Sequence, residues 1–171
     1  MMQYPTKGAY HGIANPGDYI SIERRTLSPT AFNFQLSKST ENPTTAECSI
    51  SWADNDEALF VLADQVKDDD RSGGVRPHFL GGVCRVPMVN LENLRATYPD
   101  CFDYDRSPMD YRGHGGTHLN PYHGNLLLYN LQSKETKAAK KNIVSVLAWA
   151  ASMPLSDVYS REELDALLEK A

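Results

Sequence analysis

Three of the chain's five histidines lie in one glycine-rich run, and imidazole is the side chain best suited to acid–base and metal chemistry near neutral pH. The run extends from Gly113 to Asn125 and contains His114, His118 and His123. Its glycines and Pro121 disfavour a helix, so the spacing of the first two histidines is not that of a helical zinc motif. Three interpretations remain open: a divalent metal held by all three histidines, acid–base catalysis by His118 or His123, or a solvated loop with local hydrogen bonds.

A second glycine-flanked segment, residues 73–82, carries Arg76 and His78 in front of a predicted strand. Arginine presents two parallel N–H groups to a phosphate or carboxylate, and glycines let the backbone approach a ligand closely. If Arg76, His78 and Arg112 converge with the histidine run, the site binds anions, with Arg112 stabilising negative charge. The alternative is that these glycines only frame a strand as turn residues.

A group of lysines occupies the first half of the longest predicted helix, and Lys134, Lys137 and Lys141 share one face of it. Together with the positive end of the helix dipole, they can attract a nucleic-acid backbone, a nucleotide or an acidic partner. The alternative is a solvated helix face.

The stretch from Thr117 to Pro121, followed by residues 123–128 and the lysine-bearing helix, partly resembles the ββα metal finger of HNH endonucleases. The resemblance implies that His118 is the general base, that Asn125 orients the loop and that the lysines hold phosphates. The sequence departs from the family pattern in three ways. Thr117 stands where the family has a metal-binding Asp or His, the loop is short, and Ser133 lies near the expected closing His or Asn.

The elements that must position these residues begin after an irregular arm, residues 1–17. Alternating apolar and polar residues predict strands at 19–25, 32–36 and 46–52, and two further strands at 82–88 and 125–131. The segment 99–124 between the last two has no period, so it is predicted to be a long loop that carries the histidines.

Helices are predicted over 56–67, over a short stretch from Asn90 to before Pro99, over 133–152 and over 160–168. Ser160 and Glu163 form a capping box for the last helix, and Pro154 closes the helix before it. The order of elements predicts a single α+β domain with a mainly antiparallel sheet and helices packed on one face.

Bulk properties narrow the function classes. With 17 basic and 22 acidic residues, the formal charge of −5 restricts nucleic-acid binding to a local basic patch. The three cysteines are widely spaced and contain no Cys-x-x-Cys pair, and no apolar run is long enough to span a membrane, so a cytoplasmic protein is expected. P-loop, dinucleotide-binding, zincin and nucleophile-elbow motifs are missing.

The sequence therefore predicts a small binding or regulatory protein that uses the 99–125 segment and the neighbouring lysines to contact an anionic ligand or a protein partner. The alternative is a phosphodiesterase or nuclease-like hydrolase. In that alternative, His118 or His123 is the base, Arg76 or Arg112 stabilises negative charge, and a divalent metal takes part.

Overall fold

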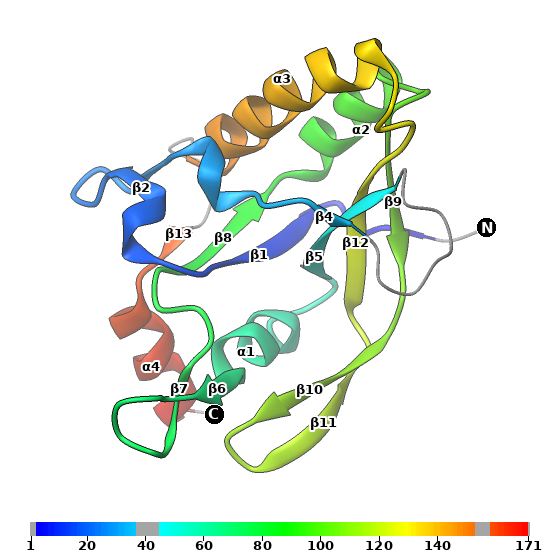
Figure 1. Cartoon of the computed structure of the whole chain (residues 1–171). Coiled ribbons are helices and arrows are strands. Elements are labelled where there is room, and N and C mark those ends of the chain that lie inside the picture. Colours follow the sequence, from blue (N-terminus) through cyan, green and yellow to red (C-terminus); the bar gives the residue numbers. More distant parts are fainter. Residues whose placement is uncertain (1–2, 37–44, 153–157, 171) are drawn as a thin grey trace.

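A seven-stranded antiparallel sheet forms the centre of the computed structural model (Figure 1), which describes residues 3–36, 45–152 and 158–170. Six strands run in the order β13-β8-β1-β5-β12-β9, and β4 pairs with β5 beside this path. The strands are β1 (Ala9–Ile13), β4 (Gln35–Leu36), β5 (Ala46–Trp52), β8 (Gly82–Val86), β9 (Phe102–Arg106), β12 (His123–Leu128) and β13 (Val158–Tyr159). The predicted α+β class and its mainly antiparallel sheet are confirmed.

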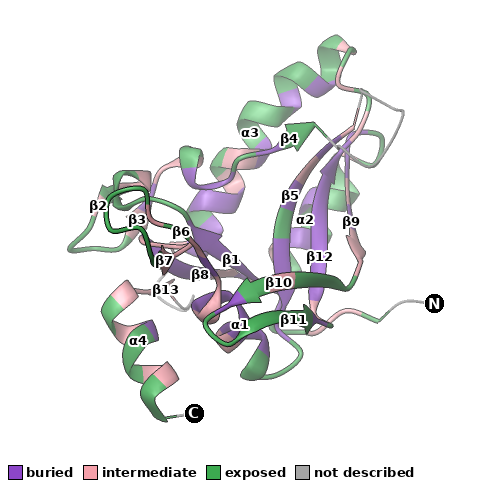
Figure 2. Ribbon diagram, turned by 60° about the horizontal axis from the view of Figure 1, so that its bottom comes forward, coloured by how far each residue is buried: buried purple, intermediate pink, exposed green. Residues whose placement is uncertain are grey.

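Three small hairpins surround the sheet. They are β2 (Tyr19–Ser21) with β3 (Thr26–Leu27), β6 (Val66–Asp68) with β7 (Val75–Pro77), and β10 (Met109–Gly113) with β11 (Gly116–Asn120). Two 3-10 helices, η1 (Pro16–Asp18) and η2 (Pro29–Ala31), flank the first hairpin. Figure 2 shows the β10–β11 hairpin as a largely exposed arm, whereas β1, β5 and β12 are largely buried.

The four helices cover both faces of the sheet, which differs from the predicted packing on one face (Figure 1). Helices α2 (Met88–Thr97) and α3 (Lys134–Ala151) pack on one face, and α1 (Glu57–Asp64) and α4 (Arg161–Lys170) pack on the other. The physical reason lies in β1 and β8, whose alternate residues are apolar on both sides. Cys84 joins the larger core, whereas Tyr10 and Val83 pack with Leu164 in a second cluster.

The N-terminal segment was predicted to be an irregular arm, and this prediction is wrong because β1 lies inside the sheet between β8 and β5. All five residues of β1 are buried, so the strand shows none of the alternation expected of a half-exposed one. Gly12 is required there, because a Cβ would come within 2.3 Å of the Phe79 ring.

The segment 99–124 is not a loop, since it contains β9, β10 and β11. Strand β9 does alternate, with Phe102 and Tyr104 buried and Asp103 and Asp105 half-buried, so the prediction overlooked a period that is present; the β10–β11 hairpin is mostly exposed on both sides. Strands predicted at 19–25 and 32–36 are also shorter, because residues 22–25 form a turn and residues 32–34 are irregular.

Several local predictions are confirmed. Strand β5 has the predicted bounds, and α3 begins after Ser133, whose Oγ accepts a hydrogen bond from the N–H of Thr136 at 3.1 Å. The Ser160–Glu163 capping box forms with bonds of 3.2 and 3.3 Å. Pro154 lies outside the described residues. Within the described part of the chain, no helix combines the length and apolarity needed to cross a membrane.

Candidate functional site

A groove of about 620 Å³ opens beside the end of α1, over the part of that sheet face that α1 and α4 do not cover. Strands β1 and β5 are paired at only two positions, Ala9–Trp52 and Tyr10–Ser51, at the end of β5. Strand β4 pairs with β5 only at the start of β5. The middle of β5, from Cys48 to Ile50, therefore has no strand partner on this side and lines the groove. The site exists because two neighbouring strands of the sheet part from one another.

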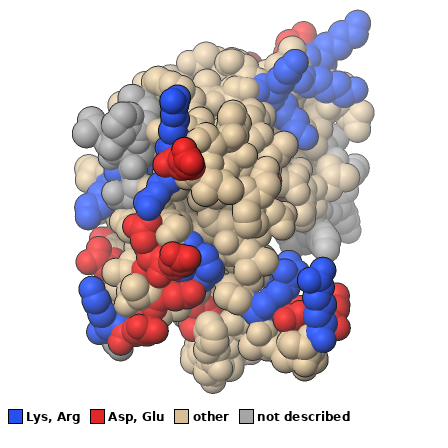
Figure 3. Space-filling model, turned by 90° about the vertical axis from the view of Figure 1, so that its left-hand side faces the viewer, with Lys and Arg blue, Asp and Glu red and all other residues tan. Residues whose placement is uncertain are grey.

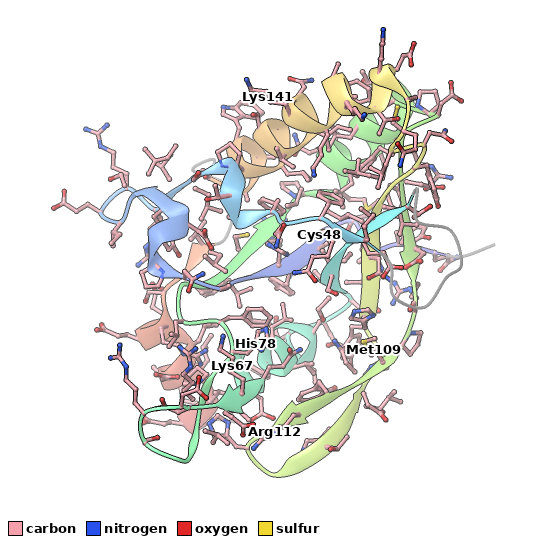
Figure 4. The ribbon with its side chains drawn as sticks, viewed as in Figure 1. Cys48, Lys67, His78, Met109, Arg112 and Lys141 are labelled. Atoms are coloured by element: carbon pink, nitrogen blue, oxygen red, sulfur yellow. The ribbon has the colours of Figure 1, made fainter. Side chains whose placement is uncertain are left out.

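The groove has two rims (Figure 4). The upper rim comprises the segment from η1 to β4 together with the first residues of β5. The lower rim comprises the end of α1, Val66 at the start of β6, the residues that follow β7, and β10. Phe79, Leu62 and Met109 give the lower rim an apolar wall among its polar groups.

Three residues singled out by the sequence line this one groove. They are His78, Arg112 and His123, which come from the segment after β7, from β10 and from β12. The other predicted site residues do not line the groove. They are Arg76, His114, His118, Lys134, Lys137 and Lys141. The structure thus brings together part of the predicted anion site and leaves the rest elsewhere.

His123 is held in a defined orientation at the start of β12. Its side chain is 8% exposed, and Nδ1 lies 2.7 Å from the carbonyl oxygen of Ser107. A carbonyl can only accept, so Nδ1 carries the proton and Nε2 is the acceptor nitrogen of the neutral ring. The groove therefore contains an imidazole able to accept a proton or a hydrogen bond.

Asn120 carries an unsatisfied buried donor in the same groove. The residue is 2% exposed, and its Oδ1 accepts a hydrogen bond from the N–H of Tyr122 at 2.9 Å. That bond fixes the orientation of the amide, so the second polar atom of the side chain is the donor Nδ2. Nδ2 has no hydrogen-bond partner in the described part of the chain. A buried N–H without a partner costs roughly 1–3 kcal/mol, so this atom marks a place where an acceptor is missing.

Two cations of the β6–β7 hairpin act on His78. Its pKa is lowered from the ordinary value of 6.5, first by burial and then by the nearby charges of Lys67 and Arg76. Lys67 and Arg76 are opposite each other in the β6–β7 hairpin. The ring of Phe79 meets the His78 ring edge-on, with the centroids 4.6 Å apart. The charges that disfavour protonation of His78 equally favour an anion beside it.

The tip of the β10–β11 hairpin is fastened to the end of α1, and this contact fixes the lower rim. Asp64 Oδ1 accepts hydrogen bonds from His114, from Nδ1 at 2.9 Å and from the backbone N–H at 3.3 Å. Gly113 forms a bridge with Gln65, and Arg112 pairs with Asp68 at 2.7 Å. His114, predicted as a ligand, thus makes a contact that positions the hairpin.

The lysines of α3 lie away from the groove. Lys141 is at the top of the molecule in Figure 4, whereas His78, Lys67 and Arg112 lie in its lower half. Figure 3 shows basic side chains gathered over α3, separate from the mixed acidic and basic side chains at the bottom. The histidine segment and the α3 lysines were predicted to form one surface, but they lie in two separate parts of the molecule.

No group of three or more His, Cys, Asp or Glu side chains in residues 3–36, 45–152 and 158–170 is placed to hold a metal ion. The three histidines predicted as ligands make separate contacts instead: His114 with Asp64, His118 with the ring of Tyr111, and His123 with Ser107.

The arrangement implied by the HNH resemblance is likewise not formed. His118 lies on the exposed strand β11, whereas Asn125 donates to Asp105 Oδ1 in the neighbouring strand β9.

The three cysteines are buried and free, so a thiol nucleophile is not available in the folded protein. Burial raises the pKa of Cys48 to about 12 and raises that of Cys84 as well. A thiol with a raised pKa is not ionised at neutral pH and reacts slowly.

Among the groove residues that the sequence interpretation missed are His11 and Asn120. His11 lies in β1, is 7% exposed, and has its two nitrogens 3.1 and 2.6 Å from the carbonyl oxygens of Ser49 and Ala31. Nothing in the sequence distinguishes either residue, since each becomes part of the groove only through strand pairing. Comparison with protein families, curated proteins and solved structures finds no match.

Proposed function

We propose that this protein binds a small ligand with an anionic group in the groove between β5 and the β10–β11 hairpin. The observation that carries the proposal is that Asn120, whose buried Nδ2 has no partner in the described part of the chain, lines the groove together with His78, Arg112 and His123. Nδ2 is covered in the free protein, so a ligand oxygen reaches it when a neighbouring side chain shifts; the bond then removes the cost of the unsatisfied N–H and favours the bound state.

The charges of the lower rim support an anion. Lys67 and Arg76 both act on His78, and Arg112 lies further along the same rim. Arg112 is paired with Asp68, so Lys67 and Arg76 are the cations that act on a ligand beside His78. The β6–β7 hairpin also carries Asp68, Asp69 and Asp70, so the attraction for an anion is confined to the surroundings of His78.

The size and lining of the groove suit a small molecule. Ligand pockets usually measure roughly 300–1,000 Å³ and combine apolar walls with a few convergent polar groups. Here Phe79, Met109 and Leu62 supply apolar surface, and the amide of Asn120 and the ring of His123 supply the polar contacts.

The proposal is tested by thermal unfolding and by ¹⁵N NMR with phosphate, hexanoate and AMP as probes. A ligand present at about ten times its Kd stabilises the folded state by roughly 1.4 kcal/mol and shifts the side-chain amide signals of Asn120. Lys67→Ala is expected to weaken binding of the anionic probes, and Lys141→Ala, on α3, is the matched control that leaves it unchanged. If none of the three probes moves the Asn120 signals or the Tm, the groove is not an anion site.

A second candidate function, hydrolysis of a phosphodiester, is favoured by His123. His123 and Arg112 both line the groove, which offers a base and a cation for a developing negative charge to one ligand. The assay is turnover of bis(p-nitrophenyl) phosphate with and without added Mg²⁺ or Mn²⁺. His123→Gln should abolish turnover and His118→Gln, outside the groove, should preserve it; equal loss in both variants contradicts the assignment.

A further inference from the structure

Strands β1 and β5 lack one backbone pair that their register provides for. Tyr10 lies opposite Ser51. The Trp52 N–H donates at 2.8 Å to the carbonyl before β12, so the backbone of Ser51, one residue earlier, faces β1 and is hydrogen-bonded to Tyr10. Hydrogen-bonded pairs recur at every second residue, so the next one is Gly12 with Ser49, and it is not formed.

The missing pair leaves backbone groups without partners on both strands. The Gly12 N–H and C=O face β5 rather than β8, because those of Tyr10, two residues before, face β5. Among residues 3–36, 45–152 and 158–170, these two groups and the N–H of Ser49 have no hydrogen-bond partner. The Ser49 carbonyl oxygen lies 3.1 Å from Nδ1 of His11 instead. Gly12 is buried, and buried backbone groups are almost always paired in proteins, so its two groups mark a place for a ligand.

The space between these groups belongs to the groove. Gly12 and Ser49 both line it, and so does Asn120, whose buried Nδ2 also has no partner within the described residues. The ring of Phe79 covers Gly12 so closely that a Cβ there would come within 2.3 Å of it. The gap therefore presents two backbone donors and one acceptor beside an apolar ring, and these are the groups that one strand presents to another.

We infer that the ligand is a short peptide that enters the gap between β1 and β5 in extended form. One of its residues pairs with Gly12 through its own N–H and C=O. The carbonyl before that residue points to the other side of an extended chain, where it accepts from the N–H of Ser49. This inference rests on the proposed function, because it names the chemical class of the ligand in the same groove, with the terminal carboxylate as its anionic group.

The experiment compares four compounds by ¹⁵N NMR titration of the full chain. N-acetyl-dialanine carries peptide groups and a carboxylate, and its N-methylamide carries the peptide groups without a charge. A form with both amide nitrogens methylated keeps the carboxylate but cannot donate, and hexanoate has only the carboxylate. N-acetyl-dialanine is expected to bind at least about tenfold more tightly than the methylated form and hexanoate, because both lack the donor for the Gly12 carbonyl. The amide-proton signals of Gly12 and Ser49 should move downfield on binding.

Two proline variants localise the donor on β5. Proline is tolerated where a strand N–H has no partner, so Ser49→Pro should fold and should weaken the binding of N-acetyl-dialanine about tenfold. Thr117→Pro is the matched control that leaves the affinity unchanged. The Thr117 N–H points away from β10, has no partner within the described residues and lies outside the groove. If Ser49→Pro does not fold, the methylated compound decides alone.

The outcomes separate the peptide from the anion site. If the methylated form binds as tightly as N-acetyl-dialanine, the inserted peptide is refuted, and binding of hexanoate still supports the anion site. If the uncharged N-methylamide moves the Gly12 signal while hexanoate, phosphate and AMP do not bind, the peptide stands and the anion proposal fails. If no compound moves the Gly12 and Ser49 signals, the peptide is refuted and the phosphate and AMP titrations decide the anion site.

Discussion

Substitution of Gly113 by alanine should release the tip of the β10–β11 hairpin from α1. A Cβ at this position would lie 2.1 Å from Asp64 Oδ2, far closer than any real contact, so the carboxylate must move. Its movement breaks the hydrogen bonds of 2.9 and 3.3 Å that Asp64 Oδ1 accepts from His114. The lower rim of the groove then loses the contact that positions it.

The cost follows from those two bonds. A hydrogen bond contributes about 0.5–1.5 kcal/mol net, and solvent reduces this value here because the His114 side chain is 55% exposed. The free energy of unfolding should therefore fall by about 1–2 kcal/mol. For a domain of this size, that loss lowers the Tm by roughly 2–8 °C. Urea denaturation measures the free energy, and hydrogen exchange of the hairpin amides reports the release directly.

A matched control and a double variant test the reasoning. Gly74→Ala, in the β6–β7 turn, has its nearest neighbour at 3.7 Å and should change stability by less than about 0.5 kcal/mol. Removing the Asp64 carboxylate should make Gly113→Ala nearly neutral, because the colliding atom and its hydrogen bonds are already gone. If Gly113→Ala costs as much in the Asp64→Ala background as alone, the collision with Asp64 is not the cause.

Three further predictions concern α3, the buried thiols and His11. Ser133→Ala removes the cap of α3 and should cost about 1 kcal/mol by urea denaturation, whereas Ser145→Ala, with its hydroxyl bonded to Lys141 within the helix, should cost little; equal losses would contradict a capping role. The thiols should resist 5,5′-dithiobis(2-nitrobenzoate) at pH 8 in the folded protein and react fully after unfolding, and rapid reaction of Cys48 or Cys84 without unfolding would disprove their burial. Burial, the largest effect, lowers the pKa of His11 below 6.5, so the unfolded chain binds the proton first and stability should fall as the pH drops below about 6.5. His11→Gln should flatten this dependence in urea denaturation and His118→Gln should not; an unchanged slope in His11→Gln assigns the effect to other groups.

Local patterns in the sequence were sufficient for elements whose signals lie within a few residues. The alternation from Ala46 to Trp52 predicts β5 with its observed bounds, and Ser133 and Ser160 mark the starts of α3 and α4. These signals are local because a helix cap bonds to a backbone N–H three residues away, and because strand side chains alternate strictly.

Elements with two similar faces escaped prediction. Strand β1 is buried on both sides, so it has no polar–apolar period to detect. The β10–β11 hairpin is mostly exposed on both sides, so the alternation of Met109 and Tyr111 with Asp110 and Arg112 does not mark a buried face. The helices were expected on one face of the sheet because the sequence does not show that Tyr10 and Val83 need an apolar cover of their own.

The sequence by itself determined which residues carry chemistry, and among them His78, Arg112 and His123 line one groove. Only the tertiary structure decided that His114 fastens a hairpin to Asp64, that the α3 lysines lie elsewhere, and that Asn120 holds an unpartnered donor. The physical reason is that the groove forms where β1 and β5 part, and such a gap depends on pairing between segments far apart in the chain.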